Sequence, residues 1–236
     1  MNSSVHFLVD ESVIVASHDR MIASDPDLSR HIDIINSSLN FLSRLPELHQ
    51  ESNDNELMLL RLAVRCFNSG ASALRLLKCG YFQPAMTMVR DLIEVYFLMD
   101  LFSRDNQALV DWRTMSEKDR KNNFKPVRVR ERLDKMDGFT GGKRRAAYDL
   151  FSQHAAHVNP NGHSLISPDN MTRIGPFSDY GLFRAGLEEV ATHLGMAAVI
   201  VCNLIKTDQP GALVEKTSFL SALQNWKANY LEPSNN

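Results

Sequence analysis

The stretch that decides the fold is PAMTMVRDLIEVYFLMDLF, residues 84–102. Apolar side chains occupy most of its positions, so they cover every side of a helix and not only one stripe. A helix of this kind lies at the centre of its bundle. Pro84 suits the first turn, because the N–H that proline lacks has no partner there. We therefore expect a central helix from Pro84 to Phe102.

Around this helix, apolar residues recur every three or four positions in three further long segments, which predicts three more long helices. Pro46 is expected to stop the first of them. The long segments are 24–46, 54–80 and 179–206, and shorter helices are expected near 109–115, 126–136, 143–157 and 219–230. The fold class is thus all-α: a helical bundle with four long core helices plus short flanking helices.

We expect residues 1–236 to form a single helical domain. Residues 1–23 fit either a strand or a helix, and residues 158–178 are interpreted as a long loop. Loops of about 20 residues are usually functional or disordered.

The composition, 44% hydrophobic and 23% charged, is that of an ordinary globular protein. Three cysteines are too few for a disulfide framework and fit a reducing cytosol. Cys66 and Cys202 lie in apolar runs and are expected to be buried. The N-terminus lacks the pattern of a signal peptide, and the apolar runs are shorter than the ~20 residues of a membrane span. These features predict a cytoplasmic protein with no membrane contact.

Charge is unevenly distributed, although the net charge is only −2. Residues 113–145 hold twelve basic and five acidic side chains, a local charge of +7. Such a segment favours an anionic partner, RNA or another polyanion. The alternative is a solvated linker and helix face. The candidate nucleic-acid contacts are Lys121, Lys125, Arg128, Arg130 and Arg132.

Arg90 and Glu94 are charged residues on a helix that is otherwise nearly all apolar, with Asp91 beside them, and their spacing of four places them on one face. A charge among apolar neighbours must be paired or face a cavity, because an isolated buried charge is very costly. The pair is expected to be buried or half-buried. It either clamps two helices together or binds a phosphate or a small polar ligand.

A second polar group occurs at the end of the helix expected over 143–157, in YDLFSQHAAH. We predict that Tyr148 and His157 point towards Arg90 and Glu94, and that the 158–178 loop covers this cluster. His154 and His157 have a spacing that suits a metal, yet two histidines alone are a weak signal, and histidines also favour helix C-termini. Nucleotide, hydrolase and zinc-protease motifs are absent, so no metal and no other cofactor is predicted.

At these two segments the chain resembles a bacterial all-helical family of unknown function, which is loosely similar to HEPN-like bundles and abortive-infection proteins. The resemblance covers about residues 61–165. It is carried by Gly80, Tyr81, Ala85, Arg90, Glu94, Tyr148, Ser152 and His157. HEPN-like ribonucleases carry a helical Arg-apolar-x-x-x-His motif. The only copy here, Arg44 to His49, contains Pro46 and is discounted.

Two functions follow as hypotheses. The first is an RNA-directed protein, of the HEPN-like ribonuclease or toxin type that acts in phage defence. In it, His157 is the general acid and base, Arg90 stabilises phosphoryl charge, and Glu94 and Tyr148 complete the site. The second is a non-enzymatic helical module, expected as a homodimer, that binds a protein partner or a small polar ligand.

Overall fold

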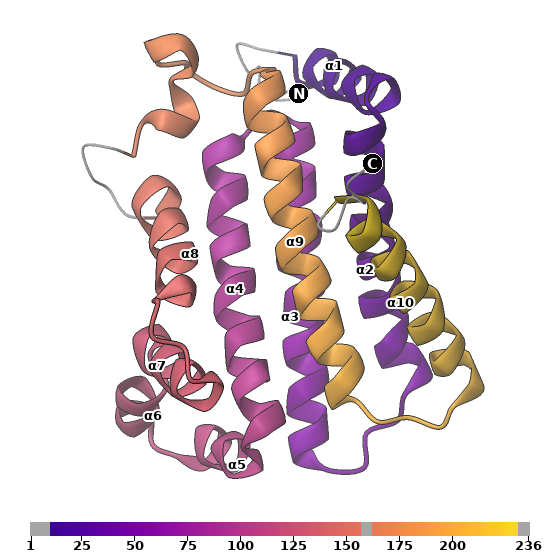
Figure 1. Cartoon of the computed structure of the whole chain (residues 1–236), viewed down its shortest axis with the longest axis vertical. Helices are drawn as coiled ribbons and strands as arrows, with labels where there is room; N and C mark the ends of the chain where they lie inside the picture. The colour runs from indigo at the N-terminus through magenta and orange to yellow at the C-terminus, as the bar shows by residue number, and fades with distance from the viewer. Residues whose placement is uncertain (1–9, 157–161, 231–236) are drawn as a thin grey trace, which may run out of the picture.

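The computed structural model describes residues 10–156 and 162–230. Within these ranges it consists of helices and turns, without a strand (Figure 1). The predicted all-α bundle is confirmed, and so are its four long helices. These are α2 (Pro26–Leu48), α3 (Asp54–Lys78), α4 (Phe82–Arg104) and α9 (Tyr180–Leu204).

The four long helices enclose the core, and α4 is central to it, as its sequence predicted. It packs against both α3 and α9, while α9 also contacts α2 and α3. Twelve residues of α4 are buried, on every side of the helix. The largest fully buried side chains include Phe41, Phe102 and Phe183, from three different helices. These side chains belong to one hydrophobic core, to which all four long helices contribute.

Helix α9 is long and apolar enough to cross a bilayer, by length and composition alone. Core helices of bundles pass the same test. In this structure 61% of its most apolar window is buried, against α2, α3 and α4. Its apolar character is therefore explained by its place in the core.

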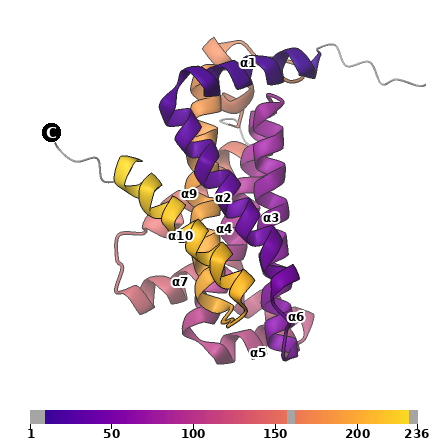
Figure 2. The same cartoon turned by 90° about the vertical axis from the view of Figure 1, so that its right-hand side faces the viewer.

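Shorter helices cover the outside of the bundle. Helix α1 (Glu11–Ser24) crosses one end, and α10 (Pro210–Tyr230) packs mainly on α2 (Figure 2). On the other side of the bundle the chain passes through α5 (Asn106–Thr114), α6 (Glu117–Asn123), α7 (Pro126–Asp137) and α8 (Lys143–Phe151). Of these, α5, α7 and α8 contact α4. Helix α6 is not among the helices predicted from the sequence. The side of α4 that carries Arg90 is thereby covered by α7 and α8.

Several predicted helix limits are wrong. Helix α2 continues through Pro46 to Leu48, because a proline this close to a helix end removes only one of the last backbone hydrogen bonds. The ambiguous N-terminal segment is helical from Glu11, where the Asp10 side chain caps the helix by accepting from the Ser12 N–H. Residues 1–9 lie outside the described ranges.

The helix predicted to reach residue 157 ends at Phe151 and is followed by one π-helical turn, Ser152–Ala156. The wider turn presents the Ala155 carbonyl to α4, where the side chains of Gln83 and Thr87 donate to it. In the predicted loop, Ser164–Ile166 and Pro168–Asn170 form short 3-10 turns.

All three cysteines, Cys66, Cys79 and Cys202, are buried and carry free thiols. The expected burial of Cys66 and Cys202 is confirmed. Burial raises the pKa of the Cys66 thiol to about 12.

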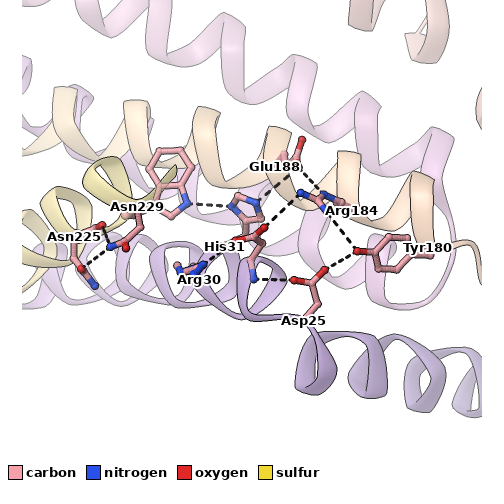
Figure 3. Close-up of polar contacts among 10 residues, drawn as sticks. Asp25, Arg30, His31, Tyr180, Arg184, Glu188, Asn225 and Asn229 are labelled. Carbon is pink, nitrogen blue, oxygen red and sulfur yellow. Dashed lines mark hydrogen bonds and ion pairs between the residues drawn. The ribbon is translucent and has the colours of Figure 1, made fainter. Parts of the chain in front are cut away.

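A polar network joins α2, α9 and α10 inside the bundle (Figure 3). Trp226 Nε1 donates to Nδ1 of the fully buried His31 over 3.0 Å, and His31 Nε2 lies 4.0 Å from Glu188 Oε1. Farther along, the Tyr180 hydroxyl donates to Asp25 Oδ2 over 2.6 Å. Indole N–H is only a donor, so His31 Nδ1 accepts and the ring proton is on Nε2. Burial lowers the pKa of His31, which keeps the ring neutral.

Candidate functional site

The structure brings Arg90, Glu94, Tyr148 and Ser152 together between α4 and α8. The Tyr148 hydroxyl donates to Glu94 Oε1 over 2.7 Å, and Arg90 Nη2 lies 2.8 Å from the same oxygen. Arg90 also donates to the Tyr148 hydroxyl, and its Nε donates to Ser152 Oγ over 3.0 Å. Tyr148 thus points towards Arg90 and Glu94, as predicted. Burial and the hydrogen bond to the Glu94 carboxylate raise the pKa of Tyr148, so the phenol stays protonated.

The Arg90–Glu94 pair is half-buried, within the predicted range. The Arg90 side chain is 22% exposed and that of Glu94 is 30% exposed. Solvent therefore still reaches both charges, and the pair is weaker than one enclosed in the core.

We predict that Glu94→Ala lowers the free energy of unfolding by about 1–2 kcal/mol, because it removes the acceptor of both Arg90 and Tyr148. Full burial of the pair would raise the loss to about 3–5 kcal/mol. Urea melts measure the difference. Glu117→Ala is the control, since Glu117 forms an exposed pair with Lys121 at the same spacing and should cost under about 0.5 kcal/mol. Equal losses in the two variants would contradict the prediction.

Arg130 of α7 adds a second guanidinium beside Tyr148. Its residue is 7% exposed, and its Cζ lies 4.1 Å from the centre of the Tyr148 ring, while the Arg90 Cζ lies 4.8 Å from it. Arg130 Nη1 is buried and has no hydrogen-bond partner. In the described part of the chain no carboxylate pairs with this guanidinium. We call Arg90, Glu94, Arg130, Tyr148 and Ser152 the Arg130 cluster.

A second ion pair lies one position along α4. The Arg65 Nε donates to Asp91 Oδ2 over 3.2 Å, and Ser69 Oγ donates to the same oxygen over 2.6 Å. Burial acts to raise the pKa of Asp91, but the hydrogen bonds from Arg65 and Ser69 outweigh it and lower the pKa. Asp91 is therefore an ionised partner for Arg65, and this pair leaves the charge of Arg130 uncompensated.

A half-open pocket of about 160 Å³ adjoins the cluster. Its walls are mainly apolar and include three aromatic side chains, and its polar edge is formed by Arg65, Glu94 and Tyr148. An apolar hollow with a few converging polar groups is typical of small-molecule sites. The other lining residues are Leu62, Val95, Phe97, Leu98, Trp112, Phe124, Pro126 and Val129.

The five predicted nucleic-acid contacts do not form one exposed track. Lys121 pairs with Glu117, Arg128 with Glu131, and Arg132 with Asp105. Lys125 is exposed, whereas Arg130 is buried in the cluster. Glu117 and Glu131 are already counted in the local charge of +7, so among these three partners only Asp105, outside residues 113–145, reduces that excess further.

Three other predictions for the site have different outcomes. His157 lies outside the described residues, so its place is not given. The prediction that the 158–178 loop covers the cluster is wrong for residues 162–178. There, Leu165 lines a separate apolar pocket with Phe82 and Met86, at the start of α4. In the two described ranges, no group of three His, Cys, Asp or Glu side chains is arranged to hold a metal.

The Arg44–His49 motif was discounted because of Pro46, and that reason is wrong, since α2 passes through the proline. The two side chains nevertheless have separate partners. Arg44 lies 2.5 Å from Glu47, and His49 Nε2 lies 2.9 Å from Glu56 Oε1. Both residues therefore have acidic partners of their own.

The sequence alone does not place Arg65, Trp112 and Phe124 around the pocket that Tyr148 also lines. Asp91 next to Arg90 indicates that this part of α4 needs a second cation, because Arg90 pairs with Glu94. The sequence does not show that Arg65 is the cation that pairs with Asp91. Arg130 was assigned to the basic surface. Its neighbours Val129 and Leu133 lie on the buried stripe of α7, which is the signal that could have placed Arg130 inside.

Residues 56–138 match a family described as "Family of unknown function (DUF5677)". The match includes α4, α5, α6 and α7, most of α3, and every lining residue of the pocket except Tyr148. The expected resemblance to an uncharacterised family is supported over this range, without any link to HEPN-like or abortive-infection proteins. No curated protein and no solved structure matches the chain significantly.

Proposed function

We propose that the protein is a ligand-binding helical module whose ligand carries a phosphate group, bound at Arg130. The single observation that carries the proposal is a buried guanidinium without a counter-ion. An ion moved out of water costs several kcal/mol unless a partner of opposite charge compensates it. Arg130 has only the face of Tyr148 as a partner among the described residues, and a cation–π contact gives roughly 0.5–2 kcal/mol.

The neighbouring arginines support this interpretation because each has its own acid. Arg90 pairs with Glu94 and Arg65 with Asp91, so three guanidiniums share two carboxylates. One positive charge is left over at Arg130. Guanidinium groups bind phosphate oxygens through paired N–H donors, which makes a phosphate a suitable counter-ion.

Calorimetric titration with inorganic phosphate, at constant ionic strength, tests the proposal. Arg130→Gln should weaken binding at least about tenfold, the scale of one lost charged hydrogen bond. Arg128→Gln is the matched control. It lies on the same helix but is exposed and paired with Glu131, so it should leave binding unchanged. Equal binding by wild type and Arg130→Gln would refute the proposal.

The same variants separate binding from folding. Without ligand, Arg130→Gln should keep or increase the free energy of unfolding, because an uncompensated buried charge is removed. A large loss of stability would show that Arg130 is a structural residue, and would contradict the proposed role.

An RNA-directed role, with the HEPN-like or phage-defence character that the sequence suggests, is a second candidate. The observation that favours it is a set of exposed lysines on α6, α7 and α8 for which the described residues provide no acid: Lys118, Lys125, Lys135 and Lys143. RNA held in this way should show an affinity that falls steeply with salt. A flat salt dependence of the binding of a single-stranded 20-mer would exclude it. Homodimer formation and a cytoplasmic location stay predictions.

A further inference from the structure

The pocket beside Tyr148 has the properties of a binding site for the rest of the ligand. Two of its walls are aromatic side chains, Trp112 of α5 and Phe124 before α7. Both are held by Phe102 of the core, whose ring centre lies 5.7 Å from that of Trp112 and 6.4 Å from that of Phe124. The Arg132 guanidinium lies over the outer side of this group, 5.6 Å from the centre of the Phe124 ring. The aromatic walls are therefore fixed before any ligand binds.

The size of the pocket limits its occupant. A cavity of roughly 150 Å³ lined by apolar side chains holds one benzene molecule. At about 160 Å³, this half-open pocket holds the volume of a single ring, and any further part of a ligand would lie outside it. Aromatic walls favour a planar ring, because offset or edge-to-face contacts add to the burial of apolar surface.

Charge decides which end of the ligand enters. The polar edge of the pocket carries the Glu94 carboxylate and the Arg65 guanidinium, and Arg65 is already paired with Asp91, so this edge offers no unpaired positive charge to an anionic group. The positive charge that needs a counter-ion is that of Arg130, on the residue that follows the pocket-lining Val129. Tyr148 connects the pocket with Arg130, because it lines the pocket and its ring faces the Arg130 guanidinium.

We propose that the ligand is a phosphate monoester of a single planar ring, with the ring between Trp112 and Phe124 and the phosphate at Arg130. This inference rests on the proposed function and names its substrate class. Aryl phosphates have this chemistry.

Phenyl phosphate and methyl phosphate test the inference, because they share the phosphate and differ in the ring. Phenyl phosphate should bind at least about tenfold more tightly, from the apolar surface that its ring buries. Trp112→Leu should reduce the affinity for phenyl phosphate to that for methyl phosphate, and leave methyl phosphate unchanged. Arg130→Gln should weaken both esters at least about tenfold.

Fluorescence provides a readout that needs no change in the pocket. In Trp226→Phe, Trp112 is the only tryptophan of the chain. Its emission, excited at a wavelength where neither ester absorbs, should change with phenyl phosphate and not with methyl phosphate. Equal affinities and no change in emission would overturn the ring site and leave the phosphate site standing. No binding of either ester, or of phosphate, would refute the proposed function itself. Phenyl phosphate binding that persists in Arg130→Gln would overturn the joint site.

Discussion

Replacement of Gly80 by alanine is expected to lower the free energy of unfolding by about 2–4 kcal/mol. Gly80 ends α3 with φ at +84°, where its N–H donates to the Leu77 carbonyl and the next N–H, of Tyr81, donates to the Leu76 carbonyl. This is the Schellman arrangement, which favours glycine. A Cβ at this position would also lie 2.3 Å from the Phe177 carbonyl oxygen and 2.8 Å from its nitrogen. An alanine at position 80 would therefore force backbone atoms to move. An alanine in the left-handed region without such close neighbours would not.

Gly138→Ala separates the two causes. Gly138 ends α7 with φ at +67°, and no atom lies within 4 Å of the position that its Cβ would take. This variant should cost only about 1 kcal/mol, the usual cost of a side chain in the left-handed region. Both variants are compared by denaturant melts. Similar losses of unfolding free energy in the two variants would show that the backbone around Phe177 can move away from the new Cβ without destabilising the protein.

Trp226→Ala is expected to have the second large effect, a loss of about 3–5 kcal/mol. The indole is 5% exposed and stacks on Tyr230, with the ring centres 5.1 Å apart. Its removal leaves a cavity between α2 and α10, and it leaves Nδ1 of the buried His31 without a donor. The cavity and the lost hydrogen bond both weaken the packing of α10 on α2, which is the main contact of α10 with the rest of the bundle.

Trp226→Phe is the control, because it keeps most of the apolar volume and loses the hydrogen bond. Its cost should be about 1–2 kcal/mol, for a buried acceptor left unsatisfied. Thermal or urea melts followed by circular dichroism give both values. If the phenylalanine variant were as unstable as the alanine variant, the hydrogen bond to His31 would dominate over packing.

The sequence predicted the parts of the fold that depend on apolar periodicity. The four long helices follow from stripes such as that of α4, and the convergence of Tyr148 with Arg90 and Glu94 follows from charges on an otherwise apolar helix. The limits of helices were less predictable. Pro46 lies in the last turn of α2, where a missing N–H is tolerated, and the π-helical turn after Phe151 depends on donors from α4.

The candidate site was only partly predictable, because its remaining members depend on tertiary contacts. Arg130 belongs to a basic segment by sequence, yet the packing of α7 on α4 buries it against Tyr148. Trp112 and Phe124 are ordinary apolar residues of short helices and turns. Nothing local shows that they line the same pocket as Glu94, 18 and 30 positions earlier in the chain.

The three buried thiols make the native protein its own reporter of local opening. A thiol reagent needs both access and the thiolate, and burial withholds both. Cys66 lies in the middle of α3, Cys79 at its end, and Cys202 near the end of α9. The three labelling rates would therefore measure how often three separate regions open, without any introduced residue. Fraying at the end of α9 would be recorded at Cys202 long before Cys66 reacts, and the order of labelling would map cooperativity within the bundle.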